Sequence, residues 1–318
     1  MRAAIRGAGV VGPFGCGLAG LAEAIGRLPA TDAGAGAGLT AETGMLDRMI
    51  PPRTLRRVEH YGRMAILAAH LAIEDAGLAG AVPGDTGLVV ATGMGPTANT
   101  LDRQPVDIPL ADLALSPILF SNSVQNAAAA HISMLLGMRG PSLSINQYEL
   151  GVPLAFQAAL DWLEEGRTGT VLVGCVDGFS TALHEEALRC GGADAVSVGE
   201  GSAFFVLTAD EAGSGAHPIV EAVRTGGPGP SLERPVADAL VLRNGVRPTD
   251  APGDERCLSG VYGSFPTSMG MDVAAAVILL RAGGLPGIQW PAAGRRGRVC
   301  CLKEGESGDR GAVVLGRG

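Results

Sequence analysis

Reactive side chains are scarce in this sequence, and their spacing assembles no familiar catalytic set. Lys303 is the only lysine among 318 residues. The five histidines are dispersed, at His60, His70, His131, His184 and His217. The six cysteines form no C-x-x-C pair and have no His-rich neighbour, which predicts neither a zinc site nor a disulfide framework. We therefore expect no metal, reduced thiols and a cytoplasmic location.

One glycine motif suggests a cofactor. Gly7-x-Gly9-x-x-Gly12 follows an expected strand, as do the glycines that approach a pyrophosphate in dinucleotide-binding proteins. Pro13 follows where a helix should begin, and the region near Asp32 is an Ala/Gly loop rather than the end of a second strand. We therefore expect the glycines to turn the chain tightly after a strand and expect no cofactor. A dinucleotide-binding oxidoreductase is the less favoured alternative.

Composition narrows the class of partner. The 24 basic residues are outnumbered by 32 acidic ones, so we expect no nucleic-acid partner and no anionic membrane surface. Glycines interrupt the apolar N-terminal stretch, and no apolar run of about 18 residues follows. This pattern predicts neither a signal peptide nor a membrane span.

The surrounding sequence predicts an α/β fold. Short apolar runs bounded by glycine indicate six buried strands, at residues 3–5, 87–91, 143–145, 171–173, 204–207 and 312–315. Helical spacing indicates helices at about 58–76, 150–165 and 271–282. Residues 213–252 are rich in Gly, Pro and charge. We therefore divide the chain into a half at 1–212 and a shorter half at 213–318, which together form one structural unit.

Five segments, in order and spacing, resemble landmarks of the β-ketoacyl-acyl-carrier-protein synthases. They are GAGVVGPFG (7–15), AIEDAGL (72–78), GLVVATGMG (87–95), NAAAAHISMLLGMRGPSLSI (126–145) and VGEGSAFFVLT (198–208). The resemblance covers residues 1–210 and resumes at 260–286. It implies a thiolase fold, which is a five-layer αβαβα sandwich of two pseudo-repeated halves. The C-terminal half is shortened here.

The residues that the family uses for catalysis are replaced. Counting from Gly140-Pro141, the position of the family's nucleophilic cysteine holds Glu149. In the Lys-x-x-x-Gly-His element, Tyr262 takes the lysine position and Thr267 takes the position of the second histidine. The earlier His-Gly-Thr motif has no counterpart, and Lys303 lies beyond the matching segment. A Claisen condensation needs these groups together, so we predict no catalytic residues of that kind.

A ketosynthase fold without its catalytic groups resembles a chain-length factor, the β subunit of type II polyketide ketosynthases. The resemblance implies a heterodimer with an active ketosynthase α subunit, in which the chain shapes the tunnel for a polyketide or polyene. The implied second partner is an acyl carrier protein with a phosphopantetheine-bound chain.

Two surface sets are assigned by resemblance or by charge. The expected tunnel or interface residues are Leu119, Phe120 and Val124, for which ordinary core packing is the equal alternative. A basic cluster offers a dock for an acidic carrier protein, and solvated side chains are its alternative. The cluster comprises Arg53, Arg56, Arg57 and Arg63.

Glu149 keeps two interpretations open. It stabilises an empty pocket through backbone N–H groups or a partner's arginine, or it is the general base of a standalone acyl-thioester enzyme.

Overall fold

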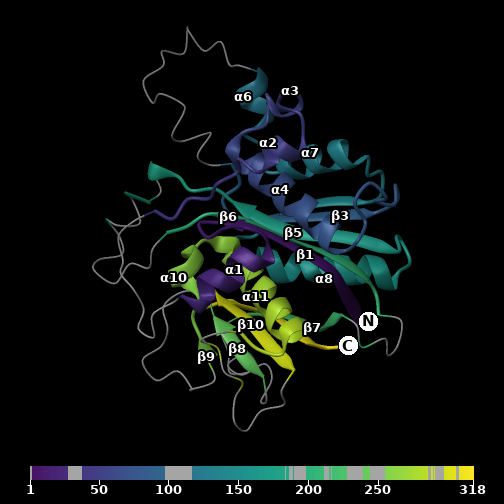
Figure 1. Ribbon diagram of the computed structural model, residues 1–318, viewed down its shortest axis with the longest axis vertical. Coiled ribbons are helices and arrows are strands. Elements are labelled where there is room, and N and C mark those ends of the chain that lie inside the picture. The colour runs from purple at the N-terminus through teal and green to yellow at the C-terminus, as the bar shows by residue number, and fades with distance from the viewer. Residues whose placement is uncertain are drawn as a thin grey trace.

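The protein is an α/β molecule built on one large mixed sheet (Figure 1). The computed structural model describes residues 2–27, 38–96, 117–182, 184–185, 189, 198–210, 215, 217–227, 239–243, 255–285, 288, 290, 297–305 and 308–318. The strand order in this part of the chain is β4-β3-β5-β6-β1-β7-β11-β10-β8-β9, and β2 pairs with β1 off this path.

The strands fall into an earlier and a later set. The earlier set is β1 (Ala3–Gly12), β2 (Gly15–Cys16), β3 (Gly87–Thr92), β4 (Ser142–Asn146), β5 (Thr170–Asp177) and β6 (Gly201–Ala209). The later set is β7 (Pro218–Gly226), β8 (Leu240–Arg243), β9 (Glu255–Arg256), β10 (Arg298–Glu304) and β11 (Arg310–Arg317). All six apolar runs that the sequence predicted as strands lie within these elements.

The sheet repeats its own topology. With β2 set aside and the strands of each set numbered in chain order, the first half reads 3-2-4-5-1 and the second reads 1-5-4-2-3. Equivalent neighbours are also parallel or antiparallel alike. The halves join where Ala3 and Ala4 of β1 lie opposite Val220 and Ile219 of β7. The predicted pseudo-repeat is therefore confirmed, whereas the division after residue 212 lies outside the described residues.

The longer helices are α1 (Gly17–Gly26), α4 (His60–Asp75), α7 (Ala127–Leu136), α8 (Gly151–Glu164) and α11 (Met269–Ala282). The shorter ones are α2 (Leu46–Met49), α3 (Pro52–Leu55), α6 (Pro117–Ser121), α10 (Ser259–Tyr262) and the 3₁₀ turns η2 (Tyr148–Leu150) and η5 (Pro266–Ser268). None of these helices is both long and apolar enough to cross a membrane.

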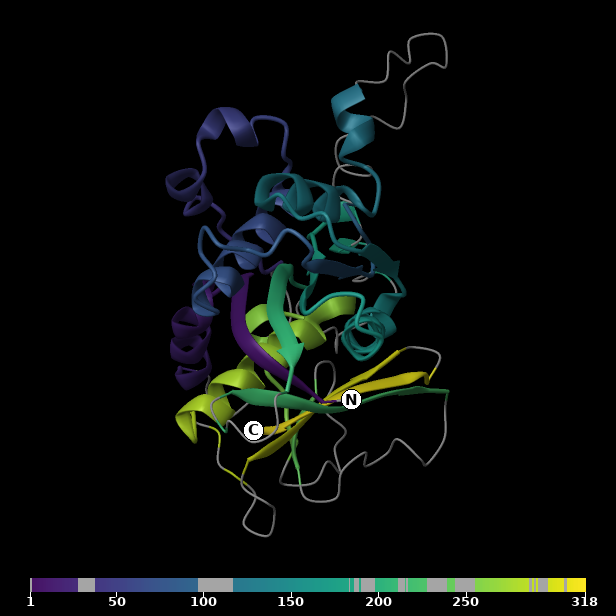
Figure 2. The same cartoon turned by 90° about the vertical axis from the view of Figure 1, so that its right-hand side faces the viewer.

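The helices form layers on the sheet. α8 and α11 pack in one apolar core with the inner faces of both halves, and Figure 2 shows them between the two parts of the sheet. α4 and α7 cover the opposite face of the first half. On the outer face of the second half a small buried cluster contains Cys300, Leu302 and Val314. No described helix packs there, so the described residues supply four of the five expected layers.

Helix boundaries agree closely with the sequence pattern. α4 was expected at 58–76 and covers His60–Asp75. It ends two residues before Gly77, whose φ of 70° favours glycine because glycine lacks a Cβ. α8 and α11 likewise end before Gly166 and Gly283, with φ of 66° and 75°. The positions of the glycines in the sequence therefore indicate where these helices end.

The N-terminal glycine motif has another role than expected. Gly7, Gly9 and Gly12 lie inside β1 rather than in a turn, and no helix begins at them. A Cβ on Gly9 would lie 2.2 Å from the carbonyl oxygen of Ala68, and one on Gly7 would lie 2.3 Å from that of Ala72. Gly7 and Gly9 therefore let α4 pack directly on β1. The tight-turn prediction was wrong for Gly7 and Gly9, whereas Gly12 ends β1 directly before the two-residue turn that leads to β2. The dinucleotide-binding alternative is overturned because the motif forms no phosphate-binding loop.

Gly9→Ala tests this close packing. The new methyl group would overlap the α4 backbone, which cannot rotate away as a flexible side chain would. We expect the free energy of unfolding in urea to fall by about 2 to 3 kcal/mol, as for an overpacked core. Gly169→Ala is the control, since its Cβ meets nothing within 4 Å. Equal stabilities of the two variants would contradict the assignment.

One predicted strand is less buried than expected. Residues 143–145 were predicted as a buried strand, but β4 is the edge of the sheet and Leu143 is 39% exposed. β4 pairs in parallel with β3 on one side. On its other side no described strand follows. A short apolar run does not distinguish a central strand from an edge strand, because both favour the same residue types.

Candidate functional site

A cavity of about 660 Å³ lies where the two halves meet. Its wall comes from the end of β3, the η2 turn before α8, the turn before η5 and the hairpin of β10 and β11. The lining residues are Met94, Gln147, Tyr148, Glu149, Leu150, Ser264, Phe265, Pro266, Lys303, Gly305 and Asp309. α8 and α11 each follow the third strand of their half, so the pseudo-repeat brings two equivalent helix starts to one place.

Tyr148 and Glu149 lie in the η2 turn, directly before α8. Tyr148 has a φ of 36° and is the non-glycine residue with positive φ in the described chain, a strained conformation that is common at functional positions. Its side chain is 58% exposed. Glu149 is half-buried, and its Oε2 would lie 3.4 Å from a Cβ placed on Gly305. The described residues give this carboxylate no backbone N–H bond, and the structural role of Glu149 stays a prediction.

Lys303 is the site residue that sequence reasoning missed. It was set aside as lying beyond the matching segment, yet β10 carries it into the cavity wall. Its side chain donates hydrogen bonds from Nζ to the Phe265 carbonyl oxygen at 3.1 Å and to Ser268 Oγ at 3.0 Å. The residue is only 4% exposed. The strand alternation was the available signal, because Lys303 shares the inward face of β10 with Cys301.

Burial lowers the pKa of the Lys303 amine, because the charged form loses its hydration. The charges of Asp272, Glu149 and Asp177 oppose this shift, in that order. The chain's single lysine therefore lies among three carboxylates at the junction of the halves.

Tyr262 and Asp272 form a closed pair behind the cavity. The Tyr262 hydroxyl donates a hydrogen bond to Asp272 Oδ1, and both residues are fully buried. Burial raises the pKa of Asp272 to about 7, while the Tyr262 hydrogen bond and the charge of Lys303 oppose the rise. Tyr262, which was placed at the family's lysine position, does not line the cavity.

Asp177 ties the two halves together beneath the cavity. Its Oδ1 accepts hydrogen bonds from Thr92 Oγ1 and from the backbone N–H of Gly93 and Met94, at 2.9 to 3.0 Å. Its Oδ2 accepts hydrogen bonds from Thr267 Oγ1 at 2.8 Å and from the Thr267 backbone N–H at 3.1 Å. Thr267, which was placed at the position of the second histidine, therefore faces a buried carboxylate rather than the cavity.

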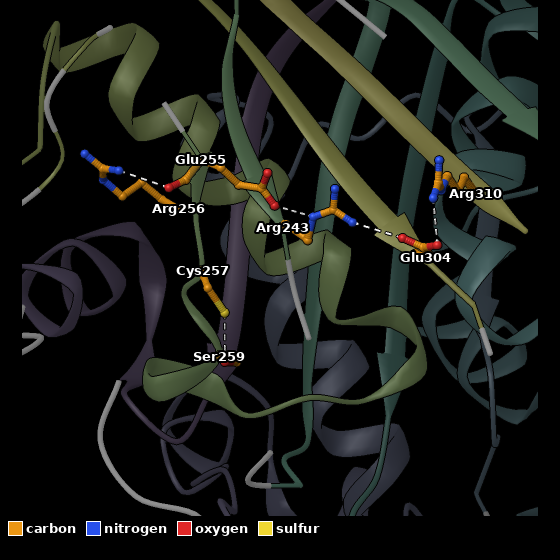
Figure 3. A network of polar contacts seen from close by, with 7 residues as sticks. All are labelled: Arg243, Glu255, Arg256, Cys257, Ser259, Glu304 and Arg310. Atoms are coloured by element: carbon orange, nitrogen blue, oxygen red, sulfur yellow. Dashed lines mark hydrogen bonds and ion pairs between the residues drawn. The ribbon is translucent and has the colours of Figure 1, made fainter. Parts of the chain in front are cut away.

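A chain of ion pairs braces the outer face of the second half (Figure 3). Arg243 of β8 pairs with Glu255 of β9 and, at 3.1 Å, with Glu304 of β10. Arg310 of β11 pairs with the other oxygen of Glu304 at 2.9 Å. Glu304 follows Lys303 and points to the opposite face of β10, because side chains alternate along a strand. These ion pairs thereby hold in place β10, the strand that carries Lys303.

Cysteine thiols do not reach the cavity in the described part of the chain. Cys175 is buried, and burial raises the pKa of its thiol to about 12. Burial raises the pKa of Cys300 to the same level. A thiol with such a pKa is not a thiolate near neutral pH, so neither group can act as a nucleophile there. No group of three His, Cys, Asp or Glu side chains among the described residues is arranged to hold a metal.

Two of the three predicted tunnel or interface residues are at the surface. Phe120 is 65% exposed and Val124 is 37% exposed. This exposure argues against the core-packing alternative for both, and neither lines the cavity. Leu119 lies in α6, and its side chain is outside the described part. Figure 2 shows α6 standing away from the body of the molecule.

The basic cluster comprises three exposed residues and one that is engaged within the fold. Arg53, Arg56 and Arg57 are exposed. Arg63 instead forms an ion pair with Asp47 at 2.8 Å and a hydrogen bond to Thr43 Oγ1 at 3.2 Å. It is thus engaged within the fold, and its part in a docking surface stays a prediction.

The fold and the cavity define a ketosynthase-like protein, and comparison with known proteins agrees. Residues 46–212, more than half of the chain, match the family described as "Beta-ketoacyl synthase, N-terminal domain". The chain belongs to this family. Nodulation protein E of Rhizobium leguminosarum bv. trifolii is 28% identical over 212 residues, which cover 59% of this chain and 53% of that protein. The match therefore spans about half the length of that relative.

Solved structures share the thiolase fold across the whole chain. The ishigamide ketosynthase/chain length factor superposes with a TM-score of 0.78 at 19% identity, covering 100% of this chain and 99% of that one. A type II PKS acyl-carrier protein in complex with its ketosynthase bound to the hexaketide gives 0.77 at 14% identity, covering 99% of each chain. A beta-ketoacyl synthase from Burkholderia phymatum gives 0.73 at 15% identity, covering 100% and 99%. The predicted family and fold are confirmed.

Proposed function

We propose that the protein is a non-catalytic, chain-length-factor-like subunit that pairs with an active ketosynthase and helps to form the compartment for a carrier-bound polyketide or polyene chain. One observation carries the proposal. Where α8 begins, the cavity presents Tyr148 and Glu149, and none of its described lining residues is a cysteine or a histidine. A carboxylate cannot hold an acyl chain as a stable thioester, so condensation requires a second subunit.

The exposed edge strand of the first half, β4, supports the proposal of a partner subunit. β4 ends the sheet and leaves its outer backbone groups without a described neighbour. Exposed edges of this kind invite pairing with another chain. Large apolar side chains are exposed on β4 and on the elements that precede and follow it. They are Ile118, Phe120, Val124, Met134, Leu143 and Tyr148. A partner that extends the sheet at β4 would bury such side chains.

A carrier protein is the second proposed partner. Arg53, Arg56 and Arg57 follow one another closely on and after α3, and all are exposed. An acidic carrier protein would be drawn to such a cluster, and the attraction would weaken with salt. Arg63 is left out of the proposed dock because it is paired with Asp47.

Co-expression with a candidate ketosynthase tests the pairing. We expect native mass spectrometry to find a heterodimer of one copy of each chain. Leu143→Asp should weaken it at least tenfold, because a charge at a pairing strand edge would have to be desolvated. Met45→Asp is the control, since Met45 is similarly exposed, at 41% against 39%. A chain that stays alone with every ketosynthase encoded beside it would defeat the proposal.

A second function is favoured by the closeness of Glu149 and Lys303 in one cavity. In this alternative the isolated chain is an acyl-thioester enzyme in which Glu149 is the general base. Glu149→Gln discriminates between the two functions. If the isolated chain has a thioesterase or acyl-transfer activity that the variant loses by two orders of magnitude or more, the enzyme is favoured. A heterodimer that forms normally with the variant favours the non-catalytic subunit.

A further inference from the structure

The amine of Lys303 is the buried reactive group that the proposed function does not use. It lies in the wall of the cavity, and the Phe265 carbonyl oxygen and Ser268 Oγ fix its position. A flexible surface lysine has neither property. A side chain held at one place in a cavity loses less entropy when it reacts with a bound molecule.

The surroundings of the amine favour its nucleophilic form. An ammonium ion cannot attack a carbon atom, whereas a neutral amine can, and buried lysines are the ones that proteins use for Schiff bases. Burial is the largest influence on Lys303 and lowers its pKa. The groups that oppose it are the carboxylates of Asp272, Glu149 and Asp177 and the thiol of Cys257.

The lining of the cavity indicates the class of ligand. Met94, Leu150, Phe265 and Pro266 supply apolar surface. The carboxylates of Glu149 and Asp309 lie in the same wall, so an anionic ligand would be repelled while a neutral carbonyl compound would not. A volume of about 660 Å³ is within the range of small-molecule sites.

We propose that Lys303 binds neutral ketones covalently, as a Schiff base formed inside this cavity. Nζ attacks the ketone carbon and releases one proton, and the carbonyl oxygen takes up one proton to give a carbinolamine. The C–O bond then breaks, the oxygen leaves as water and Nζ loses a proton, so that amine and ketone give imine and water without any oxidant or reductant. Glu149, in the same wall, accepts the proton that Nζ releases and donates it to the oxygen.

Only the identity of the natural ligand rests on the proposed function. If the protein lines the compartment of a growing chain, the ketone is a 3-oxoacyl group, and the imine would hold that chain at a fixed carbon. The reactivity of Lys303 toward ketones is a property of the isolated chain and stands without a partner subunit.

The single lysine makes the experiment direct. The full-length chain is incubated with the N-acetylcysteamine thioester of 3-oxobutanoate and sodium cyanoborohydride, which reduces an imine to a stable secondary amine. We expect one adduct per chain, mapped by peptide mass spectrometry to Lys303, the only lysine of the sequence. It should form at least tenfold faster in the folded chain than in urea.

Variants and a second arm of the experiment sharpen the result. Lys303→Arg should form no adduct at residue 303, and Glu149→Gln should slow its formation at least tenfold. Asp161→Asn, an exposed change on α8, should leave the rate unchanged. An adduct that forms without cyanoborohydride would be an amide from acyl transfer, and it would overturn the proposal. So would an unlabelled Lys303 in the folded wild-type chain, a result that does not depend on whether a variant folds.

The same samples separate this proposal from the function above. A chain that forms the heterodimer but never labels at Lys303 would lose only the covalent site. A chain that labels but never associates with a ketosynthase would lose only the proposed function.

Discussion

Asp177→Asn is expected to destabilise the protein by about 3 to 5 kcal/mol, although it changes the side chain by a single group. Both carboxylate oxygens accept hydrogen bonds from donors, which are Thr92 Oγ1, Gly93 and Met94 on one side and Thr267 on the other. In either orientation of the asparagine amide, its NH₂ group replaces one carboxylate oxygen and faces buried N–H and O–H donors. An unsatisfied buried donor costs about 1 to 3 kcal/mol, and at least two such groups lose their acceptor.

The measurement for Asp177 is urea unfolding followed by circular dichroism. Asp161→Asn makes the same chemical change at an exposed position of α8 and should cost less than about 0.5 kcal/mol. Because Asp177 positions both Met94 and the turn of η5, the variant should also lose labelling at Lys303 before it unfolds. A stability within about 1 kcal/mol of wild type would show that the hydrogen bonds of Asp177 to the two halves are not important.

Asp272→Asn is expected to gain stability over wild type as the pH rises from about 4 to about 7. Burial raises the pKa of Asp272 from 3.8 to about 7 in the folded protein. Below about pH 4 the carboxyl group is protonated in both the folded and unfolded states and makes no difference. Between the two values the folded state binds the extra proton, so wild-type stability falls as the pH rises and levels off above about 7. The rise in the pKa of Asp272 corresponds to a loss of roughly 4 kcal/mol in the unfolding free energy of the wild type across this pH range.

The difference in unfolding free energy between variant and wild type isolates this group. Lys303 and Tyr262 face Asp272 in both proteins, and an asparagine oxygen can still accept the Tyr262 hydrogen bond. Titrating groups that do not interact with Asp272 cancel in the difference, whereas Lys303 is coupled to Asp272 and contributes to it. Urea titrations at pH 4.5, 6 and 7.5 measure it. A difference that stays constant across the three would refute the assignment of a neutral, buried Asp272.

The sequence was sufficient for the elements and the family. Apolar periodicity and glycine punctuation placed α4, α8 and α11 correctly within two residues at each end, because these signals act within a single helix. The sequence was insufficient to predict the role of the β1 glycines and the exposure of β4. The glycines of β1 are explained by contact with α4, some sixty residues away, and the exposure of β4 depends on which strand ends the sheet.

The candidate site was predicted only in part. Glu149 was identified and does line the cavity, whereas Tyr262 and Thr267 lie behind it in hydrogen-bonded pairs with carboxylates. Lys303 was dismissed because it follows the matching segment in sequence. The β10 strand returns to the middle of the second half, and only the topology shows that a residue so late in the chain reaches the turn before α11. Reading a catalytic pattern position by position does not detect a residue that arrives from another strand.

The place of β1 in the sheet has a consequence for synthesis on the ribosome. This first strand has its long ladder with β6, at residues 202–209, and a short one with β7. β2 pairs with only the last two residues of β1, so about two hundred residues must leave the exit tunnel before the rest of this largely apolar strand can pair. Long-range pairing of this kind is slow and prone to aggregation. Because this pairing is delayed, we expect production of the folded protein to respond to chaperone supply.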